Sequence, residues 1–528
     1  MKNKKLVIIL TSMMVLIGGI LYVNQIYNKS KNKHIPKRNN LAIMVKDESG
    51  EYISSDSIPK GNYILNEDKT ICENNGKVLN YDSTTGKVSF SFVGSDRCSL
   101  YFDKIIDTEK PVISNLTIND TTVIATLTDN IELSGYRIST SNTVEPTSWT
   151  TISGTTYNLS TTISTEGTYY LWVKDSAGNK AVSNVIDLEK KGWQTILANN
   201  TVNETTPDFS KVTTASEKGL YKADDDYTAT TGMKSYYFRG AVDNNWVKFG
   251  KENNKDMYWR IIRVNGDGSI RMIYSGTSAP TSSTATVMTG IGTQINATTY
   301  QFYSISDKSE YVGYQYINGE QHGYGECNGT SASCTVNGTT VYNSAIKQAI
   351  DKWYAGTTLE KDATTKALVS QDQIFCNDRS ASSTQTAAWT STGASYSYGA
   401  HGRLDSNKTP ILTCPTASDK FTVNTSNGNG ALTYPVGLIT ADEVALAGGV
   451  YGYSNSSYYL YTNQEYWSGS PYYFSSKTDT ARESTVTSSG NVGGSFVDYD
   501  TGTRPVISLS SSVKLSGDGT YNNVYIAS

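Results

Sequence analysis

The stretch Met257-Tyr-Trp-Arg-Ile-Ile-Arg-Val264 is followed by Asn265-Gly-Asp-Gly268 and then by Ser269-Ile-Arg-Met-Ile-Tyr274. Two runs rich in β-branched, apolar and aromatic residues, joined by turn-forming residues, predict an antiparallel hairpin. We expect Trp259 to lie in the sheet core and not to serve as a platform for a ligand. Thr and Tyr suit half-buried strands, and Asn, Gly and Ser suit turns. All five are abundant throughout, so the sequence predicts a mainly β protein.

Length and charge narrow the class of protein further. A chain of 528 residues is too long for one hydrophobic core, so several domains are expected. The formal net charge is only −4, which offers no global field to attract nucleic acid, and we predict no nucleic-acid partner. An aromatic content of 11% argues against wholesale disorder.

The N-terminus predicts attachment to the cell membrane. Met1–Lys5 is a short basic head, and residues 6–23 form an uncharged apolar run, about the minimum length for a helix that spans a bilayer. We expect a signal anchor; a cleaved signal peptide is the alternative, although Ile20–Asn24 is a poor cleavage site. A lipoprotein is excluded because no cysteine follows the run. Positive charge on both flanks leaves the orientation open by charge alone.

The cysteines favour an extracellular location for the bulk of the chain. The six cysteines fall into three pairs that are close in sequence, and an even count behind an export segment favours disulfides. Free buried thiols are the alternative. No Cys-x-x-Cys occurs and the three histidines lack ligand spacing, so we expect no metal and no cofactor. The expected pairs are Cys72 with Cys98, Cys327 with Cys334, and Cys376 with Cys414.

Composition shifts and prolines divide the chain into four parts. Residues 1–40 comprise a cytoplasmic stub, the transmembrane anchor and a basic flank, and residues 41–107 form a small β domain closed by a disulfide. Residues 108–189 form a second β domain after a linker ending at Pro111. Residues 190–528 form one large α+β domain with long insertions. In this last part we predict helices over Ser344–Tyr354 and Ala441–Ala447, the second opened by a capping box.

The second β domain resembles the bacterial immunoglobulin-like domains. The resemblance covers about eighty residues and is carried by Thr128-Asp-Asn130, Ser134-Gly-Tyr136 and Gly167-Thr-Tyr-Tyr-Leu-Trp-Val-Lys-Asp-Ser-Ala-Gly-Asn179. It implies a two-sheet sandwich that spaces or presents another domain. Within it, Asp129, Asp175 and Asn179 are expected to cap turns, and calcium binding is the alternative.

The C-terminal part resembles a bacterial surface domain related to the C-type lectin fold and to the formylglycine-generating enzymes. The resemblance covers roughly the last 270 residues and implies an exposed binding face, without fixing a function. The lectin motifs Glu-Pro-Asn, Gln-Pro-Asp and Trp-Asn-Asp are absent, which argues against a calcium-dependent sugar site. The matching pieces are Tyr258-Trp-Arg260, Tyr434–Gly449, Tyr458–Thr462, Tyr466–Phe474, Thr503–Leu509 and Ser516–Tyr521.

The same resemblance places a Ser/Gly/Asn-rich loop, Phe474–Asp500, on that face. Its Tyr and Arg side chains would offer large contact areas with few rotatable bonds; ordinary solvated loop residues are the alternative. The candidate ligand contacts are Trp467, Tyr472, Tyr473, Arg482, Glu483, Asp498, Tyr499 and Asp500.

Catalytic machinery is not evident in the sequence. A triad would need His322 or His401, and each lies in a glycine-rich loop where exposure is the simpler expectation. Asp442 and Glu443 are expected to serve the helix start, and the run Asp224–Asp226 a solvated loop. We therefore expect a membrane-anchored extracellular protein whose stalk presents a lectin-like head to a glycan or protein. The alternatives are a cell-wall or glycan-modifying enzyme in the same fold, and a structural envelope protein.

Overall fold

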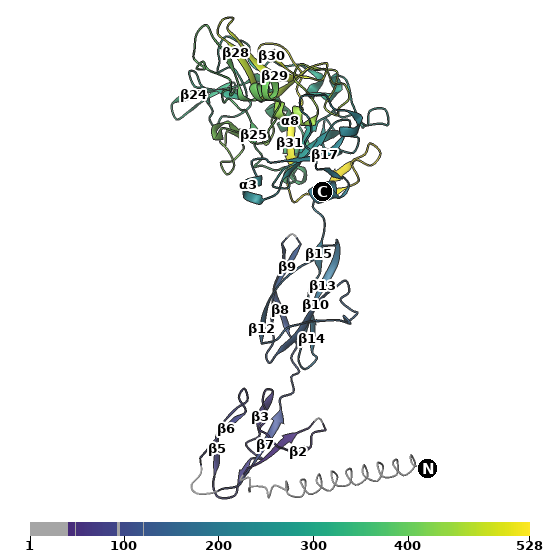
Figure 1. The fold of residues 1–528 in the computed structure, drawn as a ribbon, viewed down its shortest axis with the longest axis vertical. Coiled ribbons are helices and arrows are strands. Elements are labelled where there is room, and N and C mark those ends of the chain that lie inside the picture. Colours follow the sequence, from purple (N-terminus) through teal and green to yellow (C-terminus); the bar gives the residue numbers. More distant parts are fainter. Residues whose placement is uncertain (1–40, 48, 92–95, 120) are drawn as a thin grey trace, which may run out of the picture. The chain divides into compact units, whose positions relative to one another are not determined.

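A computed structural model describes residues 41–528 except 48, 92–95 and 120. The chain is mainly β and divides into two compact units at Leu188 and Glu189 (Figure 1). The predicted anchor, residues 6–23, lies outside the described residues. Among the described residues, no helix has both the length and the apolar character needed to cross a membrane.

The first part of unit 1 is a small β domain with little core. Strands β1 and β7 pair in parallel at its centre, while β2, β3 and β4 pair antiparallel with them. Among the described residues of this domain, only Cys98, Leu100 and Phe102 are buried hydrophobic residues of its core cluster. The strands are β1 Leu41–Lys46, β2 Tyr52–Ser55, β3 Tyr63–Leu65, β4 Ile71–Cys72, β5 Lys77–Asp82, β6 Lys87–Ser91 and β7 Cys98–Lys104.

The second part of unit 1 has two sheets that share one apolar core. Val123, Leu127 and Leu133 are among the fully buried residues between them. One sheet has the order β12-β9-β8 and the other β11-β10-β13-β14, with β15 also paired to β13. The strands are β8 Val112–Asn119, β9 Thr122–Thr128, β10 Leu133–Ser139, β11 Thr150–Thr151, β12 Thr156–Thr162, β13 Gly167–Asp175, β14 Lys180–Val182 and β15 Ile186–Leu188.

Unit 2 is built on a nine-stranded sheet that contains the predicted hairpin. Strands β20 and β21 pair antiparallel, and Trp259 on β20 is completely buried, as expected. Strand β31 pairs with β21 and brings the C-terminal apolar run into the same sheet. The strands are β16 Val202–Asn203, β17 Gly219–Ala223, β18 Ser235–Arg239, β19 Trp246–Glu252, β20 Lys255–Val264, β21 Ile270–Tyr274, β31 Val506–Leu509, β32 Leu515–Ser516 and β33 Tyr525–Ala527.

A second, four-stranded sheet of unit 2 runs in the order β26-β28-β29-β30. It corrects the prediction that Phe474–Asp500 is a loop, because β29 and β30 account for much of that segment. The sequence Thr480-Ala-Arg-Glu-Ser-Thr-Val486 contains β-branched residues, which favour a strand, and pairs with β28. The strands are β26 Ser395–Ser397, β28 Tyr466–Ser475, β29 Thr480–Val486 and β30 Val492–Phe496.

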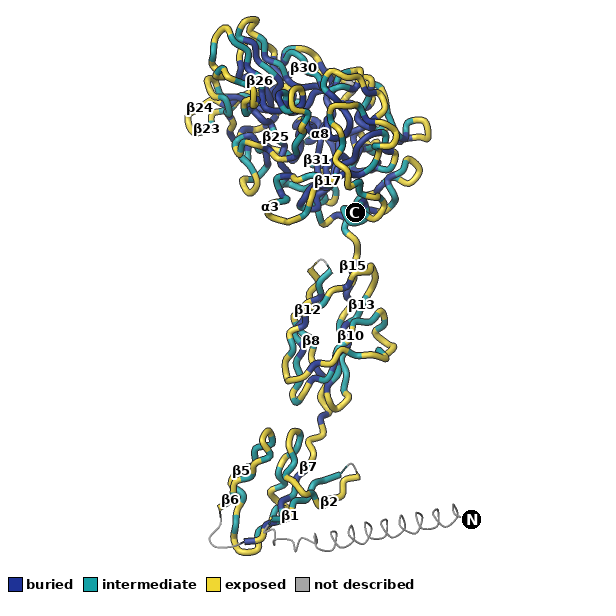
Figure 2. The backbone as a smooth tube through the Cα atoms, viewed as in Figure 1, coloured by how far each residue is buried: buried dark blue, intermediate teal, exposed yellow. Residues whose placement is uncertain are grey.

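Both predicted helices are present in unit 2. Helix α4 spans Ala345–Gly356, and the hydroxyl of Ser344 caps it by accepting from the backbone N–H of Lys347. Helix α8 spans Ala441–Ala447, is buried along its whole length, and contacts both the large sheet and the four-stranded sheet (Figure 2). The remaining elements are α2 Gly192–Ala198, α3 Thr228–Thr231, α5 Thr358–Lys361, α6 Ala363–Ala367, α7 Gly399–Gly402, β22 Gln315–Tyr316, β23 Ser333–Val336, β24 Thr339–Asn343, β25 Phe375–Cys376 and β27 Lys420–Phe421.

All three expected disulfides are present. They join Cys72 to Cys98, Cys327 to Cys334, and Cys376 to Cys414. In the small first domain the Cys72–Cys98 bridge links β4 to β7 and contributes Cys98 to a sparse core. The alternative of free thiols is therefore wrong for this structure.

Candidate functional sites

The candidate contacts around β28–β30 do not form one exposed surface. Trp467 is fully buried, its indole N–H donates to the carbonyl of Tyr300 at 2.7 Å, and its ring packs edge-on against Phe302. Tyr472 is 9% exposed and its hydroxyl bonds to that of Tyr451. These two aromatic rings belong to the core, because their partners come from neighbouring strands and loops.

Glu483 is also inside the molecule. It is 0% exposed, and its Oε2 accepts one hydrogen bond, from the backbone N–H of Gly313 at 3.1 Å. Burial raises the pKa of Glu483 well above its ordinary value of 4.5, and the Gly313 N–H and Arg379 offset this only in part. A carboxyl that is fully enclosed offers no surface to a macromolecular ligand.

The remaining candidates lie nearer the surface. Arg482 is half-buried with its guanidinium 4.2 Å from the centre of the Phe496 ring, and the Tyr473 hydroxyl bonds to that of Ser395. Asp498 is half-buried, and its carbonyl accepts from Gln301. Tyr499 is 55% exposed and Asp500 is exposed, so these two residues are the members of the predicted set that are freely accessible.

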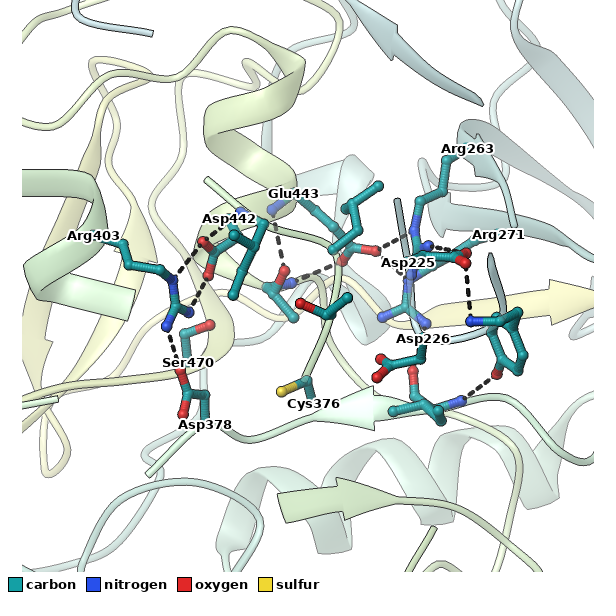
Figure 3. Close-up of a pocket in the computed structure, with 16 residues that line it drawn as sticks. Asp225, Asp226, Arg263, Arg271, Cys376, Asp378, Arg403, Asp442, Glu443 and Ser470 are labelled. Carbon is teal, nitrogen blue, oxygen red and sulfur yellow. Dashed lines mark hydrogen bonds and ion pairs between the residues drawn. The ribbon is translucent and has the colours of Figure 1, made fainter. Parts of the chain in front are cut away.

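A cluster of buried charges connects α8 to the large sheet (Figure 3). Glu443 pairs with Arg271 at 2.6 Å and with Arg263 at 3.0 Å, and Arg263 also pairs with Asp225 at 3.1 Å. Burial raises the pKa of Glu443, but the attraction of Arg271 and Arg263 outweighs it and holds that pKa below 4.5. Asp225 is 4% exposed, so the prediction of a solvated loop for Asp224–Asp226 is wrong at this position.

A second group of ion pairs extends the cluster toward α7. Arg403 pairs with Asp378 at 2.8 Å and with Asp442 at 2.9 Å. Burial raises the pKa of Asp442, and Arg403 opposes that rise. The expected helix-start role is confirmed for Glu443, whose side chain accepts from the backbone N–H of the N-cap Thr440. Asp442 instead binds Arg403 and accepts from the N–H of Ile411.

The space inside this charge cluster suits a water molecule and not a ligand. The cavity lined by these side chains measures about 20 Å³, whereas ligand pockets occupy about 300–1,000 Å³. Carboxylates and guanidiniums neutralise one another across the cavity. We interpret the cluster as a structural element that fixes α8 between the two sheets.

A larger hollow opens at the predicted loop histidine, His322. Its Nδ1 lies 3.0 Å from Oδ2 of Asp419, a carboxylate with no solvent exposure. Asp419 also accepts from Nε of Arg379 at 3.2 Å and from the backbone N–H of Arg379 at 2.8 Å. The carboxylate of Asp419 thus fixes the imidazole through Nδ1, and Nε2 has no partner within the described part of the chain.

The hollow combines aromatic and polar side chains. It has a volume of about 550 Å³, with Tyr324 37% exposed and Trp389 partly buried at its wall. The amide of Gln321 is fixed by donating to the carbonyl of Arg379 and to the hydroxyl of Tyr396. The lining residues are Ile317, Gly319, Glu320, Gln321, His322, Gly323, Tyr324, Thr339 and Trp389.

The two histidines have different surroundings. No hydroxyl or thiol within the described residues bonds to His322, so a nucleophile–histidine–carboxylate triad is not formed there. His401 packs against the rings of Tyr472 and Tyr451, and burial lowers its pKa below 6.5.

Sequence reasoning missed the His322 site because its members, His322, Asp419 and Trp389, are distant in sequence and only the fold brings them together.

The chain was compared with protein-family models, curated proteins and solved structures, and no match was found in any of the three.

Proposed function

We propose that this chain is a membrane-anchored extracellular binding protein, in which residues 189–528 form a head that binds a glycan and unit 1 acts as a stalk. The hollow at His322 is the observation that carries the proposal. Its volume matches that of a small-ligand site, and its polar groups are held rigidly by buried partners. A glycan is favoured over a flat protein surface because the site is concave.

The side chains of the hollow have the chemistry that sugars need. The faces of Trp389 and Tyr324 can contact the C–H groups of a pyranose ring, while Glu320 and His322 can exchange hydrogen bonds with hydroxyls. Because Asp419 and Arg379 already fix the imidazole, little entropy is lost when a ligand hydrogen-bonds to it.

The folds of the two units, the disulfides and the N-terminal apolar run support the rest of the proposal. The two sheets around the core of residues 112–188 support an immunoglobulin-like classification, and the mixed α and β structure of unit 2 is compatible with the proposed lectin-like fold. Three disulfides suit an oxidising compartment, which agrees with the bulk of the chain lying outside the cell. The apolar run at residues 6–23 would hold the chain in the membrane.

A glycan array probed with residues 41–528 tests the binding function. Trp389→Ala and His322→Ala should each weaken the strongest signal at least about tenfold, which corresponds to about 1.4 kcal/mol. Tyr521→Ala, which truncates an aromatic residue that is 40% exposed, is the matched control and should bind normally. Loss of binding in Tyr499→Ala alone would show that the glycan binds at the turn after β30. The absence of any glycan signal would contradict the proposed function.

Protease added to intact cells tests the location separately. Residues 41–528 should be degraded from outside while a short N-terminal fragment stays with the membrane. Full protection in intact cells, with digestion only after lysis, would contradict an extracellular head whatever the array shows.

A further inference from the structure

Three aspartates meet at one end of the second β domain. Asp107 precedes β8, Asp129 directly follows β9, and Asp175 is the last residue of β13. One carboxylate oxygen from each lies within 4.8 Å of the other two. Asp107 is 8% exposed and Asp175 is 1% exposed, so the charges are placed where water cannot fully solvate them.

The hydrogen bonds of the three carboxylates leave two buried oxygens without a partner. Oδ1 of Asp107 accepts from the N–H of Glu109, and Oδ1 of Asp129 accepts from the N–H groups of Ile131 and Glu132. Oδ2 of Asp107 and Oδ2 of Asp129 are buried and accept nothing. Turn capping therefore uses one oxygen of each of these two carboxylates and leaves the other free for a different partner.

Asp175 completes the arrangement with both of its oxygens already oriented. Its Oδ1 accepts from the N–H groups of Gly178 and Asn179 at 2.6 and 2.8 Å, and its Oδ2 accepts from Nδ2 of Asn179. The same Nδ2 donates to the carbonyl of Asp107 at 3.0 Å. These bonds fix the Asp175 carboxylate beside Asp107 and leave lone pairs on its oxygens.

Lysine and arginine side chains of the described residues do not balance these charges. Within the described part of the chain, no lysine or arginine forms an ion pair with Asp107, Asp129 or Asp175. The nearby Lys180 pairs instead with Glu145 at 3.0 Å. Like charges placed this close in a poorly solvated site repel one another, and a cation bound between them would relieve that repulsion.

We propose that Asp107, Asp129 and Asp175 bind one calcium ion. Calcium–oxygen bonds are about 2.3–2.6 Å long, so oxygens up to about 5 Å apart can share one ion. The donor set is all oxygen, which selects a hard cation over zinc or copper. Calcium accepts irregular sets of six to eight oxygens completed by water, whereas magnesium demands near-octahedral geometry.

The ion would fasten the segment that leads into β8. Asp107 belongs to the connection between β7 and β8, while Asp129 and Asp175 belong to turns of the second β domain. Calcium bound to all three ties that connection to the end of both sheets. The expected consequence is a stiffer entry into the domain when calcium is present.

The test uses the full chain purified in detergent, with hydrogen exchange measured in EDTA, in calcium and in magnesium. Calcium should slow exchange of the amides that donate to the three carboxylates at least about tenfold, and magnesium should slow it less. Those amides belong to Glu109, Ile131, Glu132, Gly178 and Asn179. Calorimetric titration with calcium alone should give one site in this unit.

Asp107→Asn is the decisive variant, because it keeps the side-chain shape and removes one charge. It should weaken calcium binding at least about tenfold while the amides of β9 and β13 stay protected, which shows that the domain is folded. Asp187→Asn, an exposed aspartate on β15, is the matched control and should respond to calcium as the wild type does. Unchanged exchange in calcium, equal protection by magnesium, or full calcium affinity in Asp107→Asn would each overturn the proposal.

Discussion

At the scale of single residues, two buried glutamates of unit 2 have opposite electrostatic surroundings. Glu443 lies between Arg263 and Arg271, which hold its pKa below 4.5, whereas burial raises the pKa of Glu483 well above 4.5. Glu443 is therefore charged in the folded protein at neutral pH, and its charge is needed to balance two buried arginines. Burial disfavours the charged form of Glu483 more than the Gly313 N–H and Arg379 favour it.

Glu443→Gln should destabilise unit 2 by about 3–5 kcal/mol, because it leaves two buried guanidiniums short of a counter-charge. A depressed folded pKa adds stability above the unfolded pKa, so this contribution should be lost as the pH falls below about 4.5 through the folded pKa. Urea unfolding of residues 189–528 at several pH values measures both effects. Asp224→Asn, which breaks only the exposed pair with Lys234, is the control and should cost less than about 1 kcal/mol.

Glu483→Gln should increase the stability of unit 2 at neutral pH, whereas Glu443→Gln should decrease it. A raised folded pKa means that wild-type stability falls as the pH rises from the unfolded pKa, near 4.5, to the folded pKa. Glutamine resembles the protonated acid and removes that loss, so the variant should be more stable than the wild type at pH 7 by at least about 1 kcal/mol. The difference should shrink as the pH approaches 4.5, and a variant less stable at pH 7 would refute a raised pKa of Glu483.

At the scale of elements, α8 shows how a short helix can hold two sheets together. Its seven residues are all buried, and the capping box at Thr440 places Glu443 toward the arginines of β20 and β21. Gly448 ends the helix with φ of 127°, a backbone conformation that side chains other than glycine rarely adopt. The local sequence thus fixes both ends of the helix, and the ion pairs fix its position.

Thr440→Ala should remove the hydroxyl that accepts from the N–H of Glu443 and cost about 1 kcal/mol, within a range of about 0.5–2 kcal/mol. Thr440→Ser keeps the oxygen and should recover most of that loss. Denaturant midpoints of the two variants, compared at constant m-value, provide the measurement. Equal stability of the alanine and serine variants would show that the cap contributes nothing.

At the scale of the whole molecule, the domains differ greatly in how much core they have. Of the first-domain residues that the structure describes, only Cys98, Leu100 and Phe102 are buried in its core cluster, while the core of unit 2 runs through both of its main sheets. The Cys72–Cys98 bridge, with a sequence separation of 26, should contribute about 3–4 kcal/mol by restricting the unfolded chain. Such a contribution is comparable to the entire stability expected of so small a domain.

The double variant Cys72→Ala with Cys98→Ala should therefore unfold residues 41–107 at 37 °C and leave the other domains intact. Limited proteolysis followed by mass spectrometry should find new cleavage confined to that region. The corresponding variant at Cys376 and Cys414 is the comparison, and it should lower the stability of unit 2 without unfolding the first domain. Retained protection of residues 41–107 would show that the bridge is dispensable.

The sequence alone determined the features that depend on neighbouring residues. Apolar and β-branched runs with turn residues between them predict the β20–β21 hairpin. The spacing of apolar residues predicts α4, a capping box predicts α8, and proximity in sequence predicts all three disulfides. Each of these features depends on short-range structure. The tertiary structure decided which charged and aromatic residues meet. Trp467, Glu483 and Asp225 are buried although they are expected near solvent. His322 contacts Asp419, and Asp107 lies close to Asp175, although the members of each pair are far apart in sequence. Burial and long-range contacts arise from the packing of distant strands, which local patterns do not encode.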